Sequence, residues 1–264
     1  MANAFSGWSS VMIREMLTMV DLGALFADPA FYGIGVPRGD GRLVVVLPGL
    51  LGNDLYLQPL RRWLGWIGYS PVRSTLDFNA GCLQRLREQV LKEIMRRMAQ
   101  DPKPIAIIGH SRGGLMGWAL ASQLQEKVSH LVLLGAPVAA FRASVQSGDP
   151  LAPAGPIGRA LMRISDELRD MLDPDCNYPN CRCAMVNDVM SDLSPSTSVL
   201  SIHGSEDLVV GEMAQTIEDG EALEVNASHV GLVYNPRVYH ALGRFLASPG
   251  TRDRAAHCNQ DAHA

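Results

Sequence analysis

One stretch of the sequence runs from an apolar segment straight into a glycine-rich turn, and it reads Ile105-Ala106-Ile107-Ile108-Gly109-His110-Ser111-Arg112-Gly113-Gly114. The apolar segment has no polar alternation, which is typical of a strand buried on both faces of a parallel sheet. The largely apolar residues from Arg112 to about Gln125 predict a helix. The turn between them fits G-x-S-x-G, a pattern that at such a junction exposes a serine hydroxyl at the carboxyl edge of a sheet. The context therefore favours Ser111 as a nucleophile over an incidental serine in a turn.

The segments on either side of this turn alternate between strand and helix patterns. Apolar runs predict further strands at residues 43–47, 131–134 and 199–202, and short strands are expected around residues 69–72 and 223–225. Apolar residues at helical spacing predict helices over residues 55–66, 83–98 and 236–246. This alternation predicts an α/β fold with a mostly parallel sheet, right-handed crossovers and helices on both faces.

A serine hydroxyl becomes a good nucleophile only when a base removes its proton and a carboxylate orients that base. Around a serine on a strand-to-helix turn, the chain order is serine, acid, histidine, each after a strand. Asp207 follows the strand at 199–202, and His229 lies between the last strand and the last helix. Glu206 is the close rival for the acid. We favour Asp207 because the apolar run 208–210 would hold it inward, whereas Glu206 can turn to solvent.

Negative charge that develops on a substrate oxygen requires backbone donors nearby. The N–H of Arg112 lies at the start of a helix, where the helix dipole favours negative charge. The glycine-containing loop after strand 43–47, residues 48–54, offers a second donor, the N–H of Leu50. The alternative for this loop is a plain turn at the end of a strand.

These segments, from about residue 42 to 247, resemble the α/β-hydrolase family, and most of all its lipase-type bacterial serine hydrolases. The resemblance lies in residues 47–52, 109–114, 205–207 and 228–232, which read LPGLLG, GHSRGG, SED and SHVGL. It implies an α/β-hydrolase fold with a lid or cap insertion. It also implies an esterase or lipase with the triad Ser111, Asp207 and His229, an acyl-enzyme intermediate and no cofactor. Pro48 stands where many relatives have histidine, and this difference leaves the backbone donors intact.

Residues 137–190 interrupt the alternation, and the resemblance implies that this insertion roofs the site. A helix predicted over residues 159–172 would present its apolar side chains to an acyl pocket or pack in the ordinary way; these side chains are Leu161, Ile164, Leu168 and Met171. Three of the five cysteines, Cys176, Cys181 and Cys183, fall in the same insertion. Their spacing lacks the paired C-x2-C of structural zinc sites, so we expect no metal, and a disulfide or free thiols remain open.

The rest of the chain gives an organisation in three parts. Residues 1–41 are expected to form an N-terminal amphipathic helix, over 8–26, and a lead-in. Residues 42–248 form the α/β-hydrolase domain, and residues 249–264 are expected to be a disordered tail. Arg14, Glu15 and Asp21 interrupt the segment where a signal peptide would be uncharged, which favours a cytoplasmic location.

Composition excludes several classes of partner. The formal net charge is −4 and basic residues occur at most in pairs, so we expect no nucleic-acid binding. No apolar run reaches the roughly 18 residues of a transmembrane helix, although peripheral membrane contact through the N-terminal helix or the lid stays open.

We expect a small ester or lipid substrate with an apolar acyl group. Acyl transfer or thioester hydrolysis would use the same triad, and a non-catalytic binding protein of this fold is the alternative from another class. The natural substrate and the oligomeric state stay open.

Overall fold

The structure is a computed structural model that describes residues 18–148, 156–176, 184–210 and 220–250. Within this part of the chain, six strands form one parallel sheet in the order β2-β1-β3-β4-β5-β6. The strands are β1 (Leu43–Leu47), β2 (Ser70–Val72), β3 (Ile105–His110), β4 (Val128–Leu134), β5 (Ser198–Gly204) and β6 (Glu221–Val225). All six predicted strands are therefore confirmed, with small differences at their ends.

The direction in which the chain builds the sheet changes between β1 and β3. After β1 the chain adds β2 on one side, and it then returns to place β3 on the other side of β1. Loops that leave two such strands diverge, and in open α/β sheets ligands bind in the crevice between them. The loop after β1 and the turn that contains Ser111 lie at this point of the sheet.

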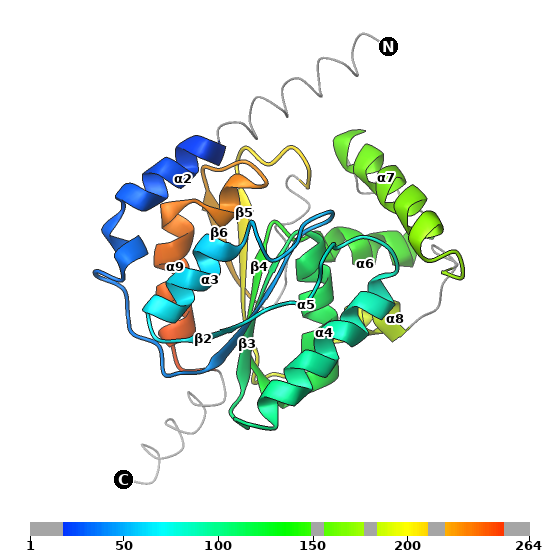
Figure 1. The fold of residues 1–264 in the computed structure, drawn as a ribbon. Helices are drawn as coiled ribbons and strands as arrows, with labels where there is room; N and C mark the ends of the chain where they lie inside the picture. Colours follow the sequence, from blue (N-terminus) through cyan, green and yellow to red (C-terminus); the bar gives the residue numbers. More distant parts are fainter. Residues whose placement is uncertain (1–17, 149–155, 177–183, 211–219, 251–264) are drawn as a thin grey trace.

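Helices cover both faces of the sheet (Figure 1), as the alternation predicts. On one face lie α2 (Thr18–Ala27), α3 (Gln58–Trp66), α9 (Pro236–Ala247) and the short helix η1 (Pro29–Tyr32). On the other face lie α4 (Leu83–Met98), α5 (Arg112–Leu124) and α8 (Ala184–Met190). Two short helices, η2 (Gln125–Lys127) and η4 (Gly231–Val233), complete the connections. Strands β1, β3 and β5 are buried along their whole length, which explains their unbroken apolar sequences.

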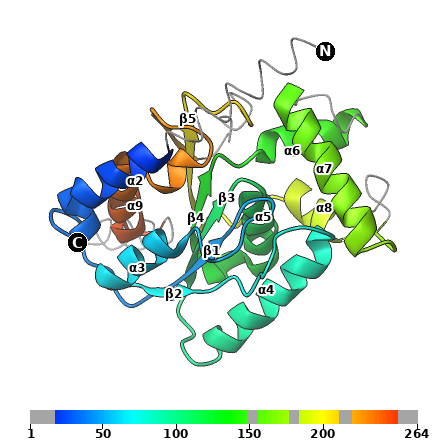
Figure 2. The same ribbon diagram turned by 45° about the horizontal axis from the view of Figure 1, so that its top comes forward.

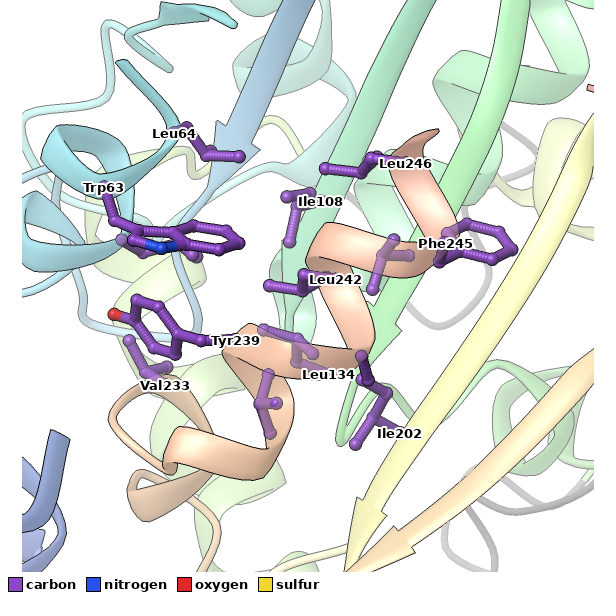
Figure 3. Packing of buried hydrophobic residues seen from close by; sticks show 14 of the residues in the cluster. Trp63, Leu64, Ile108, Leu134, Ile202, Val233, Tyr239, Leu242, Phe245 and Leu246 are labelled. Carbon is purple, nitrogen blue, oxygen red and sulfur yellow. The ribbon is translucent and has the colours of Figure 1, made fainter. Parts of the chain in front are cut away.

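Aromatic packing fixes the layer formed by η1, α3 and α9. Trp63 and Tyr239 are fully buried, and their ring centroids lie 4.8 Å apart (Figure 3). The indole N–H of Trp63 donates to the carbonyl oxygen of Ala30 at 2.8 Å. Beside these rings, Ile108 of β3, Leu134 of β4 and Leu242 of α9 belong to the same buried cluster (Figure 3). The strands that precede the functional loops are therefore held by a dense core.

The described residues of the insertion include the helices α6 (Val138–Ser147), α7 (Pro156–Leu172) and α8. Asp188 of α8 is tied to the sheet-covering helices by an ion pair with Arg87 and by its carbonyl oxygen, which accepts from Ser122 Oγ at 2.8 Å. Helix α7 lies outermost, beyond α6 and α8 (Figure 2). Among its described side chains only Arg169 is buried, while Ile164 is 37% and Met171 69% exposed. The predicted helix is confirmed, and the lid that it would form stays a prediction.

Some expectations fall partly outside the described residues. The helix predicted over 8–26 is seen from Thr18 as α2, and the tail is described only to residue 250. Cys82 is buried and Cys176 half-buried, whereas Cys181 and Cys183 lie outside the described residues, so a disulfide stays a prediction. In the part of the chain that the structure describes, no helix is both long and apolar enough to span a bilayer. The division into 1–41, 42–248 and 249–264 also stays a prediction.

Candidate active site

Ser111 lies on a strained turn between β3 and α5. Its backbone has φ 54° and ψ −122°, a conformation that costs a non-glycine residue of the order of 1–3 kcal/mol. The turn is held to the sheet because the N–H of Ser111 donates to the carbonyl oxygen of Leu134 at 2.8 Å. A strained residue at a strand-to-helix turn is what the predicted nucleophile elbow requires.

Two glycines make this turn possible. A Cβ on Gly109 would lie 2.5 Å from the carbonyl oxygen of Gly113, and a Cβ on Gly113 would lie 2.5 Å from the carbonyl oxygens of Leu47 and Pro48. Both distances are shorter than any van der Waals contact, so no side chain fits at either position. The two outer glycines of G-x-S-x-G are therefore dictated by the close approach of the helix to β1 and β3.

Asp207 and His229 form a buried pair at the same edge of the sheet. Asp207 follows β5, His229 follows β6, and His229 Nδ1 donates to Asp207 Oδ2 at 2.7 Å. The two residues are 5% and 6% exposed. Because the carboxylate holds the proton on Nδ1, Nε2 of His229 is left as the acceptor that a general base needs.

The carboxylate of Asp207 is kept ionised in spite of its burial. Burial alone would raise its pKa, but the hydrogen bond and charge of His229 and the N–H groups of Val210 and Val209 outweigh that effect and lower the pKa. Both N–H groups donate to Asp207 Oδ1 at 2.9 Å. The reason for the inward position of Asp207 thus differs from our expectation. Leu208 is 42% exposed, so backbone donors rather than an apolar run hold the carboxylate.

Gly135, at the end of β4, lies against this pair. A Cβ at this position would lie 3.2 Å from both Asp207 Oδ2 and His229 Nδ1, and the backbone has φ 55°. Its N–H donates to the carbonyl oxygen of Ile202 at 2.8 Å, which ties β4 to β5 next to the site. A side chain here would push apart the two groups whose contact defines the pair.

The loop after β1 leaves the backbone N–H of Leu50 uncommitted. The N–H of Gly49 donates to the hydroxyl of Tyr56 at 2.6 Å, and the N–H of Leu51 donates to the carbonyl oxygen of Asn79 at 3.0 Å. Between them, the N–H of Leu50 meets no acceptor in the described part of the chain. Leu51 has φ 60°, so the loop is turned sharply at the following residue. The loop thus presents one donor at the edge where the elbow also presents the first N–H of α5, that of Arg112.

The three proposed triad residues are not all in direct contact. Asp207 and His229 share a hydrogen bond, but among the described residues none joins Ser111 Oγ to His229. The serine is linked to the pair through its neighbour His110, whose ring centroid lies 4.9 Å from that of His229. Hydrogen bonds between nucleophile and base are often long in a site without substrate.

The fold is matched by known proteins. A family model described as the alpha/beta hydrolase fold matches residues 67–156, which include β3, the turn around Ser111 and β4. The chain has the α/β-hydrolase fold. The fold that the sequence predicts is therefore confirmed.

Solved structures with the α/β-hydrolase fold resemble this chain over most of its length. A pyrethroid hydrolase from Sphingobium faniae JZ-2 is 18% identical with a TM-score of 0.52, and the match covers 79% of this chain and 98% of that one. A variant of polyneuridine aldehyde esterase is 17% identical with a TM-score of 0.51, and the match covers 78% and 99% of the two chains. A comparison with curated protein sequences gives no match. At such identities the structural likeness establishes the fold.

Three residues around the site were not singled out from the sequence. Tyr56 and Asn79 hold the loop that contains Leu50, and His110 links the elbow to His229. Tyr56 and Asn79 are ordinary residues in turn-rich segments, and no motif marks them. His110 stands inside the motif next to Ser111, and the motif gives no sign of a separate role for its side chain.

Proposed function

We propose that the protein is a serine ester hydrolase that acts through Ser111, His229 and Asp207. The observation that supports this most strongly is the buried 2.7 Å hydrogen bond between His229 and an ionised Asp207 at the sheet edge that carries the elbow. A structural histidine and carboxylate would not need a strained serine at the same edge. The α/β-hydrolase fold, in which such triads occur, supports the same assignment.

In the proposed reaction, Nε2 of His229 takes the proton of Ser111 Oγ as that oxygen attacks the ester carbonyl carbon. The N–H groups of Leu50 and Arg112 stabilise the tetrahedral oxyanion, and one such donor is typically worth about 3 kcal/mol of barrier. His229 then gives its proton to the leaving alcohol, which departs and leaves an acyl-enzyme on Ser111. Water, deprotonated by His229, hydrolyses that ester and restores the serine.

The loops around the proposed site favour an apolar acyl group. Leu51, Phe78 and Leu208 are 39%, 46% and 42% exposed. Each is next in sequence to a residue that forms the proposed site or holds its loop, namely Leu50, Asn79 and Asp207. Apolar side chains at the edge of a site favour an uncharged, apolar substrate, because no polar group then has to give up its hydration.

Peripheral contact with a lipid surface and a cytoplasmic location stay predictions. Residues Met19 and Val20 of α2, 70% and 65% exposed, are where such contact would occur.

The proposed function is tested by hydrolysis of p-nitrophenyl esters with acyl chains from acetate to palmitate. We expect turnover that Ser111→Ala abolishes and that Ser205→Ala, a change at an exposed serine of the same sheet edge, leaves intact. Release of thiol from acyl thioesters and transfer to added alcohols, measured in parallel, would reveal the two related activities. Absence of turnover with every ester would contradict the proposal and favour a binding protein.

A further inference from the structure

His110 lies between Tyr56 and His229 and contacts both. Its Nε2 is 2.9 Å from the carbonyl oxygen of His229, and its Nδ1 is 3.0 Å from the hydroxyl of Tyr56. The same hydroxyl accepts the N–H of Gly49 at 2.6 Å. His110 is 4% exposed, so water does not compete for these contacts.

The donor and the acceptor can be assigned for each hydrogen bond between Tyr56, His110 and His229. A carbonyl oxygen only accepts, so Nε2 of His110 carries a proton and donates it to His229. Burial, together with nearby His229, lowers the pKa of His110 to about 3, so the ring is neutral and Nδ1 is a bare acceptor. Burial also raises the pKa of Tyr56 far above its ordinary value, so its hydroxyl keeps the proton that it donates to Nδ1.

These contacts join the three parts of the proposed site. Gly49 precedes the oxyanion donor Leu50, His110 precedes the nucleophile Ser111, and the acceptor at the far end is the backbone of the base His229. The loop sits directly on the imidazole, since a Cβ on Gly49 would lie 2.9 Å from His110 Nδ1. The rings also pack, with Tyr56 and His110 centroids 5.9 Å apart and nearly perpendicular at 70°.

We propose that Tyr56 and His110 are positioning residues that set the separation between the oxyanion loop and the base. The assignment rests on the proposed function. Neither side chain touches the reacting atoms. Both act through the backbone of the residues that do, where a misplacement of about 0.5 Å is enough to impair a preorganised site. The neutral state of His110 also keeps a second positive charge away from His229 when that base takes up a proton.

The first test is Tyr56→Phe, which removes only the hydroxyl shared by Gly49 and His110. The matched control is Tyr234→Phe, because Tyr234 donates its hydroxyl to the carbonyl oxygen of Tyr56 at 2.8 Å and so supports the same segment from outside the hydrogen-bond chain. We expect Tyr56→Phe to lower kcat about tenfold with KM nearly unchanged. Binding of an acyl trifluoromethyl ketone, whose adduct carries the oxyanion, should weaken by the same factor. Tyr234→Phe should leave both quantities within about twofold of the wild type.

The second test asks whether the two residues act as one unit. His110→Gln keeps an amide N–H that can reach the carbonyl of His229 but loses the acceptor for Tyr56. If the two residues act as one hydrogen-bonded unit, the double variant, Tyr56→Phe with His110→Gln, should be no slower than the slower single variant, because residues in one network have non-additive effects. Thermal unfolding of each variant shows whether the loss of rate arises in folded protein.

Three results would contradict the inference. They are an unchanged kcat in Tyr56→Phe, an equal loss in Tyr234→Phe, and multiplicative effects in the double variant. If Tyr56→Phe does not fold, NMR of ¹⁵N-histidine-labelled wild-type protein decides, because a protonated or Nδ1–H ring at His110 near neutral pH would overturn the hydrogen-bond chain. Failure of the proposed function is distinguishable from all of these, since the wild type itself would then neither hydrolyse esters nor react with a fluorophosphonate.

Discussion

Arg112 Nη1 donates a hydrogen bond of 3.0 Å to the carbonyl oxygen of Asn79. The same oxygen accepts the N–H of Leu51 at 3.0 Å, and the fully buried amide of Asn79 donates to the carbonyl oxygen of Pro48 at 2.7 Å. Asn79 thereby connects the residue that begins α5 with the loop that contains Leu50. The two proposed oxyanion donors come from segments more than sixty residues apart, and this asparagine ties those segments together.

We expect Asn79→Ala to lower both stability and activity. The change leaves the Pro48 carbonyl without its buried donor, which should reduce the free energy of unfolding by about 1–3 kcal/mol. The loosened loop should reduce kcat about tenfold. Urea denaturation and ester hydrolysis measure the two effects. The control is Asn53→Ala, since Asn53 only accepts the N–H of Leu55 in an exposed turn. An Asn79→Ala variant as active as this control would contradict the assigned role.

Asp207→Asn should reduce kcat by about three to four orders of magnitude, because an amide favours the wrong tautomer of His229. Glu206→Gln makes the same chemical change at the preceding residue and should have little effect. The rate at which each variant hydrolyses one p-nitrophenyl ester shows which of the two carboxylates is the acid. A large loss in Glu206→Gln and a small one in Asp207→Asn would reverse the assignment of the acid.

Two glycine substitutions should have opposite effects on stability. Gly113→Ala places a methyl group 2.5 Å from the carbonyl oxygens of Leu47 and Pro48, at the end of β1, and we expect a loss of more than about 3 kcal/mol or no folding. Gly65→Ala, in α3, meets nothing closer than Pro71 Cγ at 3.9 Å and should gain about 0.5–1 kcal/mol. Thermal and urea unfolding give the comparison. Equal tolerance of both changes would show that the elbow is not packed as described.

His110 should make stability depend on pH. Its pKa is about 3 in the folded protein and 6.5 ordinarily, so the unfolded chain binds a proton in this window that the folded chain does not. The folded state is therefore stabilised above pH 6.5, and that contribution is lost as the pH falls toward 3. The full contribution is of the order of 5 kcal/mol. The lowered pKa of Asp207 acts in the same direction at the acid end.

The measurement is the free energy of unfolding in urea at several values between about pH 7 and about pH 4. The slope of that free energy against pH should be shallower in His110→Gln than in the wild type, whatever the absolute loss of stability. Tyr56, His229 and Asp207 surround the ring and are unchanged in both proteins. Identical slopes would mean that His110 titrates normally in the folded state.

Much of the fold follows from local sequence patterns. Apolar runs of strand length identify the four central strands, because these strands are largely buried on both faces and tolerate little else. The edge strands β2 and β6 are short and partly exposed, and their place in the strand and helix alternation indicates them instead. The helix predicted from residue 55 begins instead at Gln58, where Pro59 occupies the first turn. Helices α6 and α8 were not predicted, since each is short and stabilised by packing on other elements.

Some residues of the candidate site could likewise be predicted from the sequence, and others could not. Ser111, Asp207 and His229 could be proposed from their place after successive strands, and the structure brings Asp207 and His229 into contact. Tyr56 and Asn79 could not, because their partners are distant in sequence and their side chains carry no pattern of their own. Tyr56 contacts a histidine 54 residues away, and Asn79 bonds a carbonyl 31 residues away. Such contacts exist only once the sheet has formed.

The central claim is that Ser111 is a nucleophile activated by His229. It is tested most directly by treating wild-type protein, Ser111→Ala and His229→Ala with a fluorophosphonate and mapping the adduct by peptide mass spectrometry. We predict one adduct, on Ser111 of the wild type, none in Ser111→Ala, and labelling slower by at least about a thousandfold in His229→Ala. An adduct that persists in Ser111→Ala, or labelling of His229→Ala at the wild-type rate, would contradict the claim.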